Sequence, residues 1–100
     1  MMRIRRELVP ESSVEAFAGE NWLEMVVTER KMDAWQRRRG LKRFIARFAD
    51  AEVSEGGLLR GEYGTGDTEQ EAILDYARRI SCERLIVGAA RREIEVPRLK

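Results

Sequence analysis

The chain has 100 residues, the size of one small domain, and 37% of them are charged although the net charge is only +1. It has no histidine and a single cysteine, which excludes histidine-dependent catalysis, histidine metal sites and an internal disulfide. No apolar run approaches the roughly 20 residues that span a bilayer. We therefore expect a cytoplasmic protein that is not an enzyme, carries no cofactor or metal and does not contact a membrane.

The first part of the chain predicts a strand and a helix. Apolar and charged residues alternate over residues 2–9, which is typical of a short edge strand. Ser12 and Glu15 have the spacing of a capping box, so we expect a helix over residues 12–20. Trp22 follows this helix, and its side chain is expected in the core.

Three segments in the middle of the chain predict strands. Residues 22–29, 41–50 and 57–63 are rich in strand-forming residues, and side chains of one character alternate along each of them. The sequence SEGG, residues 54–57, separates the second segment from the third as a turn. This pattern indicates an antiparallel meander with one covered face.

The stretch GTGDTEQEAILDYARRI, residues 64–80, predicts the longest helix. Thr68 and Glu71 have capping-box spacing and apolar residues recur at helical intervals, so this helix is expected over residues 68–81. Two short strands, RLIVG and REIEVP, follow it. The predicted order is β-α-β-β-β-α-β-β, a single α+β domain over residues 1–100 with a mainly antiparallel sheet and two helices on one face.

Glycines before this helix raise the question of a phosphate-binding loop. Gly61, Gly64 and Gly66 fit neither the P-loop spacing nor the dinucleotide-binding spacing, and no lysine follows them. Acidic side chains at the helix entrance, among them Asp67 and Glu69, would repel a phosphate there. We therefore expect these glycines to ease a turn into the helix.

Residues 30–43 are the most basic segment. They hold seven cations and one acid, a local charge of +6, so the other 86 residues sum to −5. We expect a basic loop at residues 30–40, continued by arginines on neighbouring strands. Arginine beside tryptophan is a workable surface for nucleic acid, whereas a protein contact or a solvated loop are the alternatives. The candidate binding residues are Arg30, Lys31, Trp35, Arg37, Arg38, Arg39, Lys42, Arg43, Arg47 and Arg60.

Two family resemblances rest on the region around GEYGTGDTEQEAILDYA. The helix, three strands and helix resemble double-stranded RNA-binding domains, although that family carries lysines where this chain has Glu69, Gln70 and Glu71. Residues 22–88 are also similar to HicB-like antitoxin domains, which implies a partial ribonuclease-H-like fold that neutralises a toxin by protein contact. In general character the chain resembles small phage and prophage proteins, which implies a bacterial or viral origin.

Two functions are therefore carried forward. The leading hypothesis is a non-enzymatic module that binds a protein partner and forms a homodimer through a sheet edge. The alternative is a nucleic-acid-binding protein that uses residues 30–43 together with Arg47 and Arg60.

Overall fold

The structure, a computed structural model, describes residues 11–100 of the chain; the strand predicted at residues 2–9 lies outside them. The elements in chain order are β1 (Glu11–Ser12), α1 (Val14–Glu20), β2 (Met25–Glu29), α2 (Ala34–Arg38), β3 (Phe44–Phe48), β4 (Ala51–Glu55), β5 (Leu58–Arg60), β6 (Gly64–Gly66), α3 (Glu69–Ile80), β7 (Arg84–Val87), β8 (Arg92–Glu95) and β9 (Arg98–Leu99). The predicted α+β class is confirmed.

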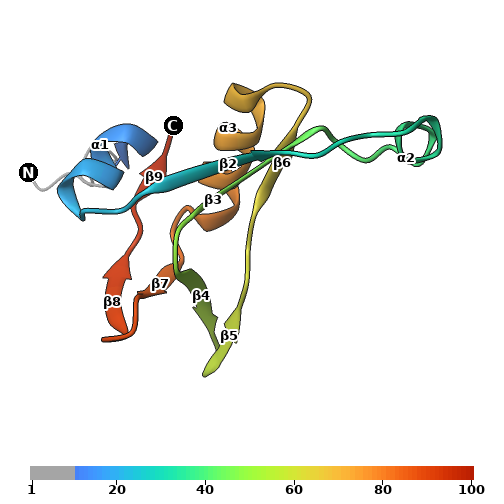
Figure 1. Cartoon of the computed structure of the whole chain (residues 1–100). Helices are drawn as coiled ribbons and strands as arrows, with labels where there is room; N and C mark the ends of the chain where they lie inside the picture. Colours follow the sequence, from blue (N-terminus) through green and yellow to red (C-terminus); the bar gives the residue numbers. More distant parts are fainter. Residues whose placement is uncertain (1–10) are drawn as a thin grey trace, which may run out of the picture.

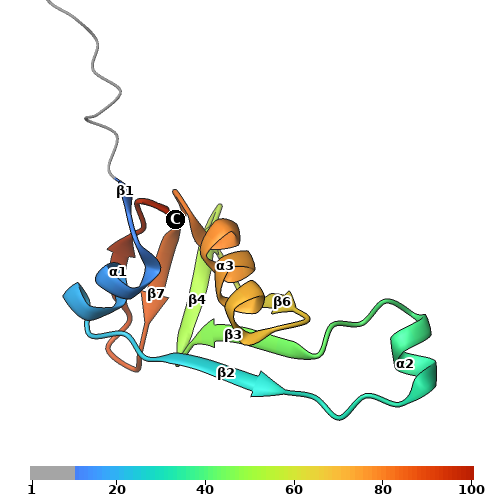
Figure 2. The same cartoon turned by 90° about the horizontal axis from the view of Figure 1, so that it is seen from above.

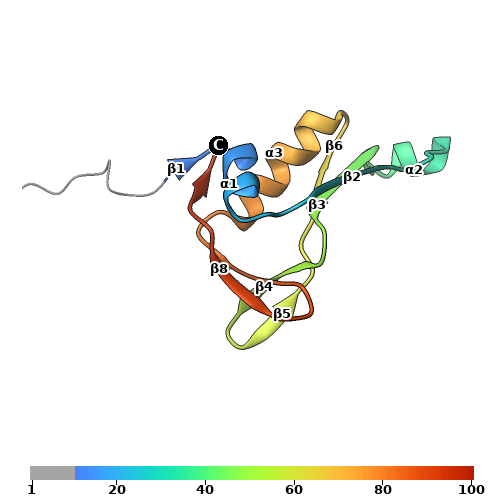
Figure 3. The same cartoon turned by 60° about the vertical axis from the view of Figure 1, so that its left-hand side comes forward.

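The strands form two antiparallel sheets and one short parallel pair (Figure 1). One sheet has the order β2-β3-β6 and the other has the order β5-β4-β7-β8, while β1 pairs with β9. Figure 3 shows α1 and α3 to one side of the three-stranded sheet, with the four-stranded sheet extending away beneath them. The mainly antiparallel pairing is confirmed, but the strands are divided between two sheets.

A bent hairpin connects the two sheets, because β3 runs into β4 and β5 leads into β6. The bend lies at Asp50, which has a φ of 54°, a left-handed conformation that is uncommon for a residue with a Cβ. The strands predicted at 41–50 and 57–63 are therefore shorter than expected, and β4 and β6 are strands that the sequence pattern did not reveal. The turn predicted between them is confirmed by Gly56 and Gly57, whose positive φ values suit a type I′ turn.

Aromatic rings join α1 and α3 to the same face of the three-stranded sheet. Phe48 of β3 contacts Phe17 of α1, with ring centroids 6.2 Å apart, and meets Tyr76 of α3 edge-on at 5.3 Å.

The cap of α1 is Ser13, which accepts the amide of the residue three positions later, and not Ser12 as predicted. The buried core consists of Val14, Phe17, Ala46, Phe48, Ala51, Val53, Ala72, Tyr76, Ala77, Ile80, Leu85, Ile94, Val96 and Leu99.

Trp22 is not in the core, contrary to the prediction. Its side chain is 88% exposed and its φ is 56°, so the chain turns sharply between α1 and β2. The Leu23 amide donates to the Ala18 carbonyl at 2.9 Å, and Leu23 packs against the core instead. Because of this turn, Leu23 and not Trp22 faces the core, and the tryptophan side chain lies in solvent.

Backbone of β6 lies directly against backbone of α3. A Cβ added to Gly64 would approach backbone atoms of Tyr76 and Ala72 closer than 3.0 Å, which real Cβ atoms essentially never do. A Cβ on Gly66 would meet Glu71 and Ala72 in the same way. The two glycines are thus strand residues that permit a close strand–helix contact, which corrects their predicted role in a turn.

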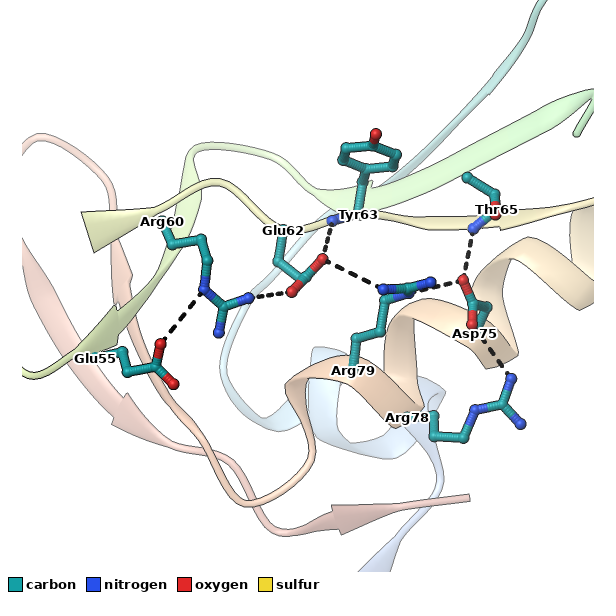
Figure 4. Close-up of polar contacts among 8 residues, drawn as sticks. All are labelled: Glu55, Arg60, Glu62, Tyr63, Thr65, Asp75, Arg78 and Arg79. Atoms are coloured by element: carbon teal, nitrogen blue, oxygen red, sulfur yellow. Dashed lines mark hydrogen bonds and ion pairs between the residues drawn. The ribbon is translucent and has the colours of Figure 1, made fainter. Parts of the chain in front are cut away.

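Asp75 of α3 connects the helix to the edge of β6 that pairs with no strand among residues 11–100 (Figure 4). Its Oδ2 accepts the Thr65 amide at 2.9 Å and the Arg79 Nε at 2.9 Å, and its Oδ1 accepts the Arg78 Nη2 at 3.2 Å. Since β6 pairs with β3 on its other side, this carboxylate satisfies a backbone donor that faces away from the sheet.

A second carboxylate extends this network to the other sheet. Glu62 accepts the Tyr63 amide at 3.2 Å and lies 3.9 Å from Arg79. It also pairs with Arg60 of β5, whose Nε lies 3.8 Å from Glu55 (Figure 4). Acidic and basic side chains therefore alternate from β4 and β5 to α3.

These partners lower the pKa of Asp75. Burial raises the pKa of this carboxyl, but the hydrogen bond from the Thr65 amide and those from Arg79 and Arg78 outweigh that effect, and the pKa lies below its ordinary value of 3.8. Because the folded pKa is below the unfolded one, the stabilisation is complete above pH 3.8 and is lost as the pH falls through the folded pKa.

The glycine contact is testable with single methyl groups. Gly64→Ala should lower the free energy of unfolding by about 3 kcal/mol, because helix backbone cannot move aside cheaply. The control is Gly61→Ala, where nothing lies within 4 Å of the added Cβ. Urea denaturation of both variants checks this, and equal midpoints would contradict the close packing of β6 on α3.

The Asp75 network makes a pH-dependent prediction. Asp75→Asn should lower the free energy of unfolding at pH 7 by about 2 kcal/mol, since charged hydrogen bonds to a shielded carboxylate are lost. The difference from the unmodified protein should shrink as the pH falls below 3.8, where the carboxylate itself becomes protonated. The control is Asp67→Asn, because Asp67 is exposed and its ion pair with Lys42 adds little. A constant difference across this pH range would contradict the assignment.

Candidate functional site

The connection between β2 and β3 projects from the body of the protein. The Arg30 amide donates to the Arg43 carbonyl at 2.8 Å and closes the base of this projection. Figure 2 shows residues 30–43 leading outward, past α3 and away from the four-stranded sheet, before they return to β3. We call residues 30–43 the basic arm.

The connection predicted as a loop at residues 30–40 contains a short helix, α2, which the prediction did not include. Asp33 accepts the Gln36 amide at 2.8 Å, and the Gln36 side chain accepts the Asp33 amide at 3.0 Å. This reciprocal capping box starts α2, and Gly40, with a φ of 77°, follows its end. None of the residues of α2 is buried, so local hydrogen bonds, and not packing on the body, give the helix its shape.

Most cations of the arm have no acidic partner in the part of the chain that the structure describes. Lys42 pairs with Asp67 at 3.3 Å, and the Arg43 Nε donates to Glu29 at 2.6 Å, both at the base of the arm. The other five, Arg30, Lys31, Arg37, Arg38 and Arg39, form no ion pair with residues 11–100. The body differs, because the arginines of its central network pair with carboxylates.

Trp35 lies on α2 among these cations. Its side chain is 56% exposed, and the Arg39 guanidinium lies 4.8 Å from the centre of its ring. A cation over an aromatic face is favourable, and it leaves the rest of the ring open to solvent. Leu41, 38% exposed, adds a second apolar side chain to the arm.

An open groove of about 1090 Å³ runs along the base of the arm. Five of the arm's cations line it, together with two acids and the apolar side chains of Met32 and Leu41, which sequence reasoning did not single out. The cations are Arg30, Lys31, Arg37, Lys42 and Arg43. The groove is therefore a basic track that begins at the body and follows the arm toward α2.

Arg30, which lines this groove, has a side-chain nitrogen in an unusual environment. Its Nε is shielded from solvent and has no hydrogen-bond acceptor among the described residues. A shielded donor without an acceptor is unfavourable, and because this Nε is closed to solvent, a contact of Arg30 with an anionic oxygen falls to the other guanidinium nitrogens. The Arg37 guanidinium, by contrast, donates to the Met32 carbonyl at 3.2 Å and is held along the arm.

Two predicted candidates lie apart from the arm. Arg47 is an exposed residue of β3 and lines a separate hollow with Asp50 and Glu52. Arg60 lies in the other sheet and is paired with Glu62, so it does not extend the basic surface. The structure thus brings together eight of the ten candidates, Arg30, Lys31, Trp35, Arg37, Arg38, Arg39, Lys42 and Arg43.

Other kinds of site find less support in the geometry. No cluster of three or more histidine, cysteine or acidic side chains among residues 11–100 is placed to hold a metal ion. Within the same residues, none of the helices combines the length and apolar character that crossing a bilayer takes. The shielded carboxylates Asp75 and Glu62 are occupied by arginines and backbone amides.

Comparison of the chain with protein-family models, curated proteins and solved structures finds no match. What the basic arm can bind therefore follows from its own charges, rings and shape.

Proposed function

We propose that the protein is a non-enzymatic binding module that holds a nucleic acid on its basic arm. The observation that carries the proposal is the presence of five cations without acidic partners among residues 11–100, on a projection whose helix α2 has no buried residue. Such side chains add little to folding, and their mutual repulsion is unfavourable, so a polyanion is the partner that compensates them. A cytoplasmic location fits this function, because nucleic acid is present there and a thiol such as that of Cys82 stays reduced.

The entrance of α3 is a poorer place for an anion. Thr68 already caps the helix by accepting the Glu71 amide at 3.1 Å, and Glu69 and Glu71 place negative charge there. Asp67 is turned to the arm through its ion pair with Lys42. The phosphates of the ligand are therefore assigned to the arm and its groove, and not to the glycine-rich corner.

The groove is also unsuited to a small neutral ligand. Small-molecule sites are mostly enclosed and apolar, with a few polar groups that fix orientation. This groove is open, and flexible charged side chains make up most of its lining. A long, charged ligand that spans the groove and the outer arm uses more of the surface.

A protein partner is the second candidate, and Trp22 favours it. A tryptophan that is 88% exposed in a left-handed conformation is unfavourable on both counts, and exposed tryptophans are frequent anchors of protein interfaces. The outer edge of β2, which pairs with no strand among residues 11–100, lies in the same part of the chain and offers backbone groups for a homodimer. This surface is independent of the arm.

Charge removal on the arm tests the nucleic-acid function. Arg37→Gln, Arg38→Gln and Arg39→Gln combined should weaken binding to an oligonucleotide. The negative slope of log K against log[salt] should become shallower by about 2, since up to three phosphate contacts are lost. Fluorescence anisotropy with a labelled oligonucleotide at several salt concentrations measures both quantities.

A matched control removes the same charge elsewhere. Arg91→Gln, Arg92→Gln and Arg98→Gln combined change three exposed arginines outside the arm and should leave the salt slope within experimental error of the unmodified protein. If the two triple variants bind alike, or if the unmodified protein binds no nucleic acid at low salt, the arm does not have this function and the protein contact at Trp22 becomes the better candidate.

A further inference from the structure

We infer that the ligand of the basic arm is single-stranded, and that an unpaired base stacks on Trp35. This inference rests on the proposed function and narrows it to one class of nucleic acid. It names a contact to the base as well as contacts to the phosphates. The evidence lies in the position of one aromatic ring relative to the unpaired cations around it.

Trp35 has no structural role that explains its position. It lies on a helix of which no residue is buried, more than half of its side chain is exposed, and it is absent from the core cluster. Replacing it would therefore cost the body of the protein nothing. A large apolar ring kept in solvent among arginines is instead what a stacking platform for bases needs.

Arg39 prepares the ring for such a ligand. Its guanidinium sits 4.8 Å from the centre of the Trp35 ring and covers one part of it, which holds the side chain of the tryptophan in place. The exposed remainder of the ring is free for a base, while the guanidinium can meet the phosphate next to that base. Aromatic ring and cation thus act on neighbouring parts of one nucleotide.

A duplex cannot use this arrangement. In double-stranded DNA or RNA the faces of the bases are stacked on one another, and a protein reaches only their edges and the backbone. Phosphate contacts alone would explain the cations of the arm but would leave Trp35 without a partner. A strand whose bases are unpaired engages the ring and the cations at once.

The groove provides the path for the rest of the strand. Arg37 and Trp35 both belong to α2, but only Arg37 lines the groove, so a strand that reaches both passes around this short helix. Farther along, the shielded Nε of Arg30 marks a guanidinium whose donors are not all satisfied by the described residues. The strand therefore runs from the base stacked on Trp35 into the groove, where Arg30 and Lys31 meet its phosphates.

Tryptophan fluorescence reports this contact directly. The chain has two tryptophans, so a Trp22→Phe background leaves Trp35 as the single reporter. Oligothymidylate and oligouridylate should both quench its emission, whereas a duplex with the same number of phosphates should quench it little and bind more weakly. The DNA strand and the RNA strand should quench the Trp35 emission to a similar extent, because both offer unpaired bases. If neither strand quenches it, the stacking contact is overturned.

A pair of variants separates stacking from charge. Trp35→Ala should lower affinity for the single strand about tenfold with the salt slope unchanged, while Trp35→Phe retains most of the affinity. Trp22→Ala is the control and should bind as the unmodified protein does. Salt-dependent binding that is equal in Trp35→Ala, or tighter for the duplex, overturns this inference and leaves the proposed function standing. Absence of binding to every nucleic acid overturns both.

Discussion

Contact between the backbones of β6 and α3 is the constraint on which the arrangement of the other elements depends. Only glycine fits at Gly64 and Gly66, because a side chain at either position would enter the helix backbone. This close approach brings Tyr76 edge-on to Phe48 and brings Asp75 to the Thr65 amide. This one contact thus positions α3, β6 and the core. It also fixes the position of the three-stranded sheet, from which the arm projects.

Charges divide the molecule into two parts with different physical roles. In the body, the shielded carboxylates Asp75 and Glu62 are each held by arginines and a backbone amide, so their charges stabilise the fold. In the basic arm, most cations have no carboxylate within reach among the described residues, and the helix that bears several of them buries nothing. A charge pattern of this kind adds little to folding and is suited to a ligand of opposite sign. The fold and the binding surface can therefore change independently.

Local signals predicted the elements that depend on neighbouring residues. The capping box at Thr68 and the apolar stripe predicted α3, and glycines predicted the turn at Gly56 and Gly57. The same kind of signal was present for α2, since Asp33 and Gln36 have capping-box spacing, but a five-residue helix among charges has no apolar stripe to support it. The cluster of candidate residues in the arm followed from charge alone.

Features that depend on contacts between residues far apart in the sequence could not be predicted from local sequence signals. The bend at Asp50 divides one hairpin between two sheets. Buried positions change phase there, from Ala46 and Phe48 in β3 to Ala51 and Val53 in β4, so no single period-two pattern covers both strands. Trp22 was expected inside because apolar residues usually pack, yet the turn before β2 assigns that place to Leu23. Arg60 was grouped with the arm because both are basic, whereas the bend carries it into the other sheet.

Amide hydrogen exchange measured residue by residue tests most directly whether a rigid body carries a separate binding arm. The account predicts that amides of α3, β3 and β6 exchange only through opening of the whole body, that amides of α2 exchange orders of magnitude faster, and that a single-stranded oligonucleotide slows exchange in the arm alone. Protection of α2 equal to that of α3 in the free protein, or oligonucleotide protection confined to the body, would contradict it.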